Sequence, residues 1–275
     1  MKKGAGIIVV GAGSMAEAFI RGVTKGGIVP PELIKVKNRS CRQHLERLVS
    51  TYGIEPADSY ADAEDTTLVV LAVKPADVEE ALMSTRSYLH GQLLISFAAG
   101  VSIAQLEEYV GHRALAVRTM PNLPVSVSAG TTAVSFSQGV SWEDRQVILR
   151  LLQQLGHAEE IPEDLMDAAT AFSGSGPGFI CYFLEAMEAA ASSLGFSPEA
   201  ARKMLLQTLV GTARTLEEWK LSPRELRQRV TSPGGTTFAG VQVLEAGDVG
   251  HTIGKAIVAA KARSAEMKSV RSTLS

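Results

Sequence analysis

The 275-residue sequence has little cysteine, few aromatic residues and almost no net charge. Cys41 and Cys181 are its two cysteines and form no CxxC pair, so we expect reduced thiols and no disulfide framework. The 5 histidines are scattered without metal-ligand spacing, so no metal is predicted. A net charge of −2 and an aromatic content of 5% argue against phosphate-backbone binding and stacked-base recognition, so no nucleic-acid partner is expected.

Long hydrophobic runs are also missing. Lys2 and Lys3 precede the apolar run Ile7–Val10, which is far too short for a secretory signal peptide. No stretch approaches the roughly 20 apolar residues that a membrane-spanning helix needs. We therefore predict a cytoplasmic protein without a membrane partner.

The first half of the chain alternates short apolar runs with segments of helical spacing. The strand-like runs are Ile7–Val10, Ile34–Lys37, Thr67–Val73, Leu93–Phe97, Leu115–Met120 and Thr131–Phe136. Continuous apolar strands separated by helices are typical of a doubly wound, mainly parallel sheet. The pattern predicts an α/β class protein with an N-terminal Rossmann domain.

From Glu163 onward nearly every segment has helical spacing, with Gly, Ser and Pro clusters between the segments. We therefore expect a second domain that is entirely α-helical. The predicted boundary divides the chain into residues 1–162 and residues 163–275.

A glycine-rich loop follows the first predicted strand and leads directly into a helix. The motif is G-x-G-x-x-A, made of Gly11, Ala12, Gly13, Ser14, Met15 and Ala16. In dinucleotide-binding domains the first glycine permits a tight turn, the second lets the backbone approach a pyrophosphate, and the third small residue allows close packing of helix and strand. The motif predicts pyrophosphate binding at the helix N-terminus. An ordinary glycine-rich turn is the alternative.

The second predicted strand ends at Asn38, Arg39 and Ser40. An NAD-preferring domain usually has Asp or Glu here to bind the ribose 2′-hydroxyl. No acid is present, whereas a guanidinium and a hydroxyl suit a 2′-phosphate. We predict a preference for NADPH, with NADH as a second donor. The alternative is a solvated arginine at the end of a strand.

Three more loops follow predicted strands and should face the ligand crevice. Backbone groups of Ala72 and Val73 are expected beside the ribose, with Lys74 nearby. Ala98 lies in a loop of small residues that permits close approach, and Asn122 could present its amide to the nicotinamide or the substrate. The alternatives are a solvated lysine at a helix start and a purely structural turn.

The helical half contains a loop suited to a carboxylate. Ser232, Gly234, Gly235, Thr236 and Thr237 combine hydroxyls, free backbone N–H groups and a helix start. A cap and turn without a ligand is the alternative. No His–carboxylate pair for alcohol oxidation is evident, which suits reduction of a C=N bond, because a protonated imine is already electrophilic.

Six segments together resemble the Δ1-pyrroline-5-carboxylate reductases, the last enzymes of proline biosynthesis. They are GAGSMA, LAVKP, AAGVS, MPNLP, SGSGP and SPGGTT…VLE. The resemblance implies NAD(P)H-dependent reduction of 1-pyrroline-5-carboxylate to L-proline. It also implies a homodimer interleaved through the helical domains, which therefore serve as dimerisation and substrate domains, often assembled further into decamers.

The family's residue roles transfer to this sequence by position. Gly11–Ala16 would hold the pyrophosphate and 38–40 the adenosine phosphate, while Lys74, Pro75, Ala98 and Asn122 would border the nicotinamide. The 232–236 loop would bind the substrate carboxylate, and Thr237 matches the catalytic hydroxyl residue beside the ring nitrogen. Gly178 replaces a common Ala and Ser59 an occasional Asn. The alternatives are a related imine or hydroxyacid reductase, or a regulatory NADP-binding paralogue with little turnover.

Overall fold

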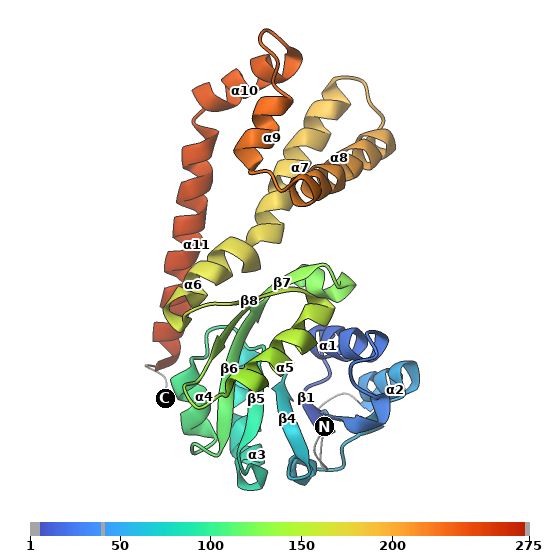
Figure 1. Cartoon of the computed structure of the whole chain (residues 1–275), viewed down its shortest axis with the longest axis vertical. Helices are drawn as coiled ribbons and strands as arrows, with labels where there is room; N and C mark the ends of the chain where they lie inside the picture. The colour runs from blue at the N-terminus through green and yellow to red at the C-terminus, as the bar shows by residue number, and fades with distance from the viewer. Residues whose placement is uncertain (1–5, 40–41, 273–275) are drawn as a thin grey trace. The chain divides into compact units, whose positions relative to one another are not determined.

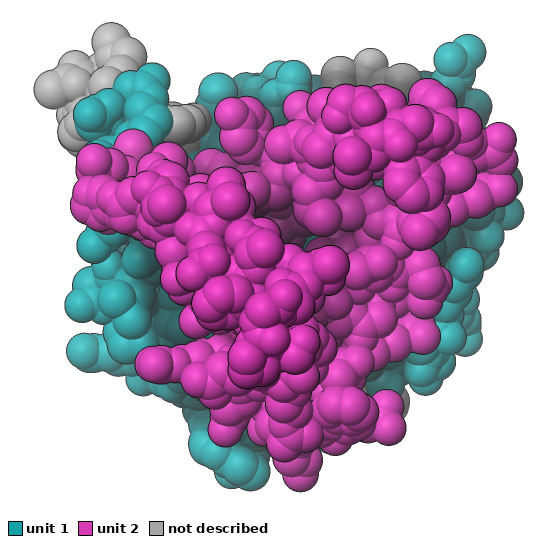
Figure 2. All heavy atoms as spheres, turned by 90° about the horizontal axis from the view of Figure 1, so that it is seen from above, with its two compact units in different colours: residues 1–175, 260–275 teal, residues 176–259 magenta. Residues whose placement is uncertain are grey.

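The computed structural model describes residues 6–39 and 42–272, which form two compact units (Figure 1). The first unit comprises residues up to 175 together with those from 260 onward, and the second comprises 176–259 (Figure 2). The boundary predicted at residue 162 thus falls inside the first unit. The reason is packing: Met166 and Ala171 lie beyond the change from strands to helices but are buried against the sheet-bearing unit.

The first unit is built on an eight-stranded sheet of order β3-β2-β1-β4-β5-β6-β7-β8. All neighbouring strands are parallel except β6 and β7, which are antiparallel. The strands are β1 (Gly6–Val10), β2 (Ile34–Lys37), β3 (Glu55–Pro56), β4 (Thr66–Leu71), β5 (Gln92–Ser96), β6 (Ala114–Pro121), β7 (Gly130–Phe136) and β8 (Gly156–Glu160). The predicted doubly wound sheet is confirmed.

Both faces of the sheet are covered, as its unbroken apolar strands require. Ile7 and Val9 belong to one buried cluster, whereas Ile8 and Val10 belong to the other. The first cluster includes α1 (Ser14–Lys25), α2 (Arg42–Tyr52) and α5 (Trp142–Leu152), and the second includes α3 (Val78–Thr85) and α4 (Ile103–Tyr109) (Figure 1). Alternate side chains of each central strand therefore hold opposite helical layers.

Short helical turns connect these elements. They are η1 (Pro31–Leu33), η2 (Tyr60–Ala63), η3 (Pro75–Asp77), η4 (Arg86–Tyr88), η5 (Leu123–Val127), η6 (Gln153–Leu155), η7 (Glu163–Leu165), α6 (Met166–Ala169) and the π-helical turn η8 (Thr170–Gly174).

The second unit is helical, as predicted. It contains α7 (Gly176–Ser193), α8 (Pro198–Trp219), α9 (Pro223–Arg229), α10 (Thr236–Ala246) and the start of α11 (Val249–Ser272). Ser197 and Ser222 begin α8 and α9, because each accepts a backbone hydrogen bond at the N-cap and is followed by proline. Arg202 of α8 donates two hydrogen bonds to Glu188 of α7, at 2.8 and 3.1 Å.

Two classes of feature are missing from the described part of the chain. None of its helices combines the length and the hydropathy needed to cross a bilayer. Its histidine, cysteine and acidic side chains also form no group of three that could hold a metal ion.

Candidate active site

The order of the strands in the sheet reverses between β1 and β4, and the loops after β1, β2 and β4 lie at this point. β1 pairs with β2 on one side and with β4 on the other. The Gly11 N–H donates to the Lys37 carbonyl at 2.8 Å, and the Ala72 N–H donates to the Val10 carbonyl at 2.8 Å. In open α/β sheets, ligands bind at such a crossover, outside the carboxyl ends of the strands.

Gly11 occupies a position that only glycine can fill. Its φ of +108° is unfavourable for other residues, and an added Cβ would lie 2.4 Å from the Ala72 carbonyl oxygen. The absence of a side chain at Gly11 therefore allows the backbone after β1 to lie close to the backbone after β4. The conformation supports the tight-turn role expected for this glycine.

Gly13 differs from Gly11, because an added Cβ there would meet no atom within 4 Å. It is the N-cap of α1 and has no side-chain capping bond. The first N–H groups of α1 therefore open onto space rather than onto a capping side chain. Together with the positive end of the helix, this arrangement fits a pyrophosphate.

A cavity of about 380 Å³ extends from this loop. Its lining comprises Val10, Gly11, Ala12, Gly13, Lys37, Asn38, Arg39, Tyr60, Ala72, Val73, Lys74, Asp77, Glu80 and Ala81. Eight predicted cofactor residues are among them, so the structure brings the glycine loop, the end of β2 and the end of β4 to one cavity. Ser14, Met15, Ala16, Pro75, Ala98 and Asn122 are not in this lining, and Ser40 lies outside the described residues.

Arg39 reaches across the cavity to two carboxylates. Its guanidinium forms ion pairs with Glu80 and, at 3.3 Å, with Asp77. The hydrogen bond to Glu80 raises the pKa of Arg39. The arginine at the end of β2 is therefore neither simply solvated nor a free donor: its fork already has anionic partners.

Tyr60 forms another part of the cavity wall. The Lys37 ammonium lies 5.9 Å from the centroid of its ring and donates to the Asp58 carbonyl at 2.6 Å. Burial raises the pKa of the Tyr60 hydroxyl. The phenol offers a flat ring beside the Lys37 ammonium.

The Asn122 amide connects two protein segments. Its Nδ2 donates to the Ser173 carbonyl at 3.2 Å, and its Oδ1 accepts from the Thr131 N–H at 2.8 Å. Ser173 belongs to the π-helical turn η8. These contacts use one of the two amide N–H groups and one acceptor position. In this structure the Asn122 side chain therefore links the backbone of β7 to that of η8.

The predicted carboxylate-binding loop lies in the helical unit and forms a glycine turn. Gly234 has a φ of +72°, and the Gly235 N–H donates to the Ser232 carbonyl at 3.0 Å. Gly235 is the N-cap of α10 and has no side-chain capping bond, so the first N–H groups of this helix remain available. The loop thus suits a small carboxylate.

Histidine–carboxylate pairs do occur, but away from the cavity. His157 pairs with Glu159 on edge strand β8 at 2.9 Å, and His90 lies 3.9 Å from Glu64 before the amino end of β5. Neither histidine lines the cavity described above. The two pairs lie outside the part of the described chain that forms this cavity.

The comparisons with known proteins agree with this arrangement. Residues 163–267 match the family model described as pyrroline-5-carboxylate reductase dimerisation, and residues 6–100 match the model described as NADP oxidoreductase, coenzyme F420-dependent. Pyrroline-5-carboxylate reductase 2 of Bacillus subtilis is 38% identical over 260 residues, which cover 94% of each chain. The chain belongs to the pyrroline-5-carboxylate reductase family.

Solved structures of this family share the whole fold. The pyrroline-5-carboxylate reductase of Coxiella burnetii has a TM-score of 0.91 at 34% identity and covers 95% of this chain and 98% of its own. The pyrroline carboxylate reductase of Plasmodium falciparum, solved with NADP bound, has a TM-score of 0.84 at 28% identity, with coverage of 97% and 99%. The predicted family and fold class are confirmed.

Six residues that line this cavity were not among the predicted cofactor residues: Val10, Lys37, Tyr60, Asp77, Glu80 and Ala81. Tyr60, Asp77 and Glu80 come from η2, η3 and α3, none of which contains a nucleotide-binding motif. Asp77 and Glu80 are spaced i, i+3 and so share one face of a helical segment that follows β4. That spacing is the signal that could have identified the two acids.

Proposed function

We propose that this chain reduces 1-pyrroline-5-carboxylate to L-proline, the last step of proline biosynthesis, with NADPH as the preferred electron donor. The observation that carries the proposal is the cavity at the ends of β1, β2 and β4, which brings the glycine-rich loop of Gly11 and Gly13 beside Arg39. Family membership supplies the substrate. The NADP-bound structure of the Plasmodium falciparum relative supports the donor.

The cofactor's chemistry is hydride donation, and this chain's residues hold and orient it. The first N–H groups of α1 would bind the pyrophosphate, and Arg39 the ribose 2′-phosphate. Ala72, Val73 and Lys74 lie at the end of β4, where they would border the ribose. Asn122 and Ala98 would fix the loops beside the nicotinamide.

The 232–237 loop would bind the substrate carboxylate through its backbone N–H groups. Anchoring the carboxylate would restrict the orientation of the imine carbon for hydride transfer, and such orientation contributes a large part of catalysis in reactions of this kind. Reduction adds a hydride to the carbon of the C=N bond and a proton to the nitrogen. Thr237, in the first turn of α10, would supply that proton or hold the water that does.

The first test is oxidation of NADPH by the purified protein with pyrroline-5-carboxylate, repeated with NADH and with the six-membered piperideine-6-carboxylate. We expect rapid turnover of the five-membered ring with preference for NADPH. Tight NADPH binding without turnover would contradict the proposal and favour a regulatory paralogue. Turnover of a hydroxyacid instead would favour a related reductase.

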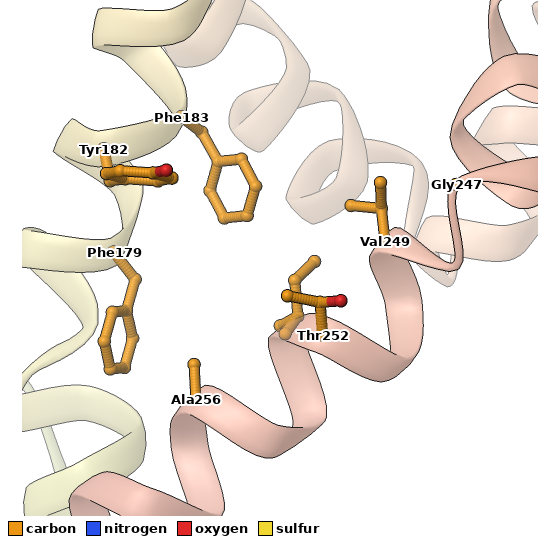
Figure 3. A pocket seen from close by; sticks show the side chains of 8 residues that line it. Phe179, Tyr182, Phe183, Gly247, Val249, Thr252 and Ala256 are labelled. Carbon is orange, nitrogen blue, oxygen red and sulfur yellow. The ribbon is translucent and has the colours of Figure 1, made fainter.

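We further propose that the active form is a homodimer in the cytoplasm, joined through the helical units. An apolar cavity of about 360 Å³ separates α7 from α11 within the second unit (Figure 3). Its lining comprises Phe179, Tyr182, Phe183, Gly247, Val249, Thr252, Ile253 and Ala256.

The exposed side chains support self-association. Within the described chain, no residue of α7 or α10 is buried, and Tyr182 and Val243 are 71% and 72% exposed. Exposed apolar surface of this extent marks an interaction site. Light scattering after size exclusion should give the mass of a dimer, or of a decamer if dimers assemble further. A fully active monomer would contradict the proposal.

A further inference from the structure

The nucleotide cavity carries charges of both signs close together. Lys37, Arg39 and Lys74 contribute positive charge, whereas Asp77 and Glu80 contribute negative charge. A cavity built solely to attract a 2′-phosphate would have no need of the two carboxylates. Their position therefore requires an explanation that the phosphate-binding role of Arg39 does not provide.

We propose that Glu80, assisted by Asp77, determines cofactor specificity by competing with the 2′-phosphate for Arg39. Both carboxylates bind the guanidinium in this structure. A 2′-phosphate that uses the same planar fork must displace them, because an arginine offers a limited set of in-plane donors. A nucleotide without the 2′-phosphate leaves the ion pairs intact.

Displacing the two carboxylates from Arg39 costs little free energy, because all three side chains are substantially exposed. The side chains of Arg39, Asp77 and Glu80 are 60%, 39% and 63% exposed. Exposed ion pairs are weak, and a single one shifts an equilibrium by about 1.4- to 5-fold. The acids therefore moderate the preference for NADPH without abolishing it, and they neutralise Arg39 when NADH is bound.

The role of Glu80 rests on the proposed use of NADPH, but its test needs no turnover. Adenosine 2′,5′-bisphosphate and adenosine 5′-monophosphate differ only in the 2′-phosphate, so the ratio of their dissociation constants measures recognition of that group. Isothermal titration calorimetry on the full-length protein gives both constants at one ionic strength.

Glu80→Gln is expected to tighten binding of the bisphosphate by roughly two- to fivefold and to leave binding of the monophosphate unchanged. Glu79→Gln is the matched control, because Glu79 lies on the same helix but does not line the cavity. Glu79→Gln removes the same formal charge from outside the cavity lining, so it should leave the ratio of the two dissociation constants unchanged. Equal effects of the two substitutions, or no gain with Glu80→Gln, would overturn the proposal.

The tighter binding of the bisphosphate by Glu80→Gln should also depend on Arg39. In an Arg39→Ala background, Glu80→Gln is expected to change the ratio less than it does alone, because the competition no longer exists. An equal gain in both backgrounds would overturn the role assigned to the ion pair. Failure of the wild-type protein to bind either nucleotide would overturn the nucleotide site itself, whereas binding with an unaltered ratio would overturn the specificity role alone.

Discussion

Gly13→Ala should separate cofactor binding from stability, because the two glycines of the phosphate loop face different surroundings. The Gly13 backbone has a φ of −75°, which alanine adopts readily, and its added Cβ would meet no atom within 4 Å. The folded protein should therefore tolerate the substitution, and reduced freedom of the unfolded chain could even add about 0.4–1 kcal/mol.

Cofactor binding should respond in the opposite direction. The new methyl group would project into the space where the pyrophosphate approaches the start of α1. Loss of one charge-assisted hydrogen bond costs about 1.5–3 kcal/mol, which corresponds to a roughly 10- to 150-fold weaker dissociation constant. Fluorescence titration with NADPH measures the constant, and thermal unfolding without cofactor measures the stability.

Gly11→Ala provides the comparison. Its Cβ would lie 2.4 Å from the Ala72 carbonyl oxygen at a φ of +108°, so the backbone must shift. Left-handed strain costs roughly 1–2 kcal/mol and overpacking another 1–3 kcal/mol. This variant should lose both stability and NADPH binding. If Gly13→Ala bound NADPH as tightly as wild type, the pyrophosphate would not lie where the loop geometry places it.

Three further predictions concern catalysis, stability and pH. Thr237→Ala should lower kcat by roughly 100-fold or more if the hydroxyl acts in proton transfer, with the NADPH dissociation constant unchanged and activity partly restored in Thr237→Ser; full turnover would remove Thr237 from the mechanism. Glu163→Ala should lower the free energy of unfolding in urea by about 3 kcal/mol, because Glu163 pairs at 3.0 Å with Arg118, whose side chain is 4% exposed. The more exposed pair of Glu160 with Arg145 is the control. An equally small loss of stability in Glu160→Ala and Glu163→Ala would contradict the reasoning. Asp62→Asn should reduce stability near neutral pH and have less effect in acid. The hydrogen bond from Lys35 lowers the pKa of Asp62, so the contribution of Asp62 to stability is present above the ordinary carboxyl pKa and is lost as the pH falls through its pKa in the folded protein. An equal difference in stability between the two proteins at both pH values would refute this.

The central sheet could be predicted because its strands are buried on both faces. Ile7–Val10 and Thr66–Leu71 are nearly continuous apolar runs, and their burial follows directly from that composition. The edge strands have no such pattern. β8 has the sequence GHAEE with one buried residue, Ala158, and β3 is two exposed residues ending in proline. Their pairing depends on neighbouring strands rather than on their own residues.

The domain boundary shows a second limit of sequence patterns. The change from strand spacing to helical spacing near residue 162 lies between the end of β8 at Glu160 and the start of η7 at Glu163. The compact units instead divide after Ser175, because the turn η8 stays with the first unit, where Ser173 accepts a hydrogen bond from Asn122. Helical periodicity reports local conformation, whereas a unit boundary depends on which surface each helix contacts.

The nucleotide cavity contains residues that could be predicted from local sequence and residues that could not. Gly11, Gly13 and Arg39 were predictable because each has a role that few other residues can fill and each directly follows a strand. Glu80 was not, because an acid on an exposed helix has no distinctive local pattern, and only the fold brings it to Arg39 across 41 positions of sequence. Motif reasoning therefore identifies the groups that attract a ligand more readily than the groups that limit the attraction. Cofactor preference depends on the difference between the two, so the absence of an acid at the end of β2 is by itself an incomplete argument for NADPH.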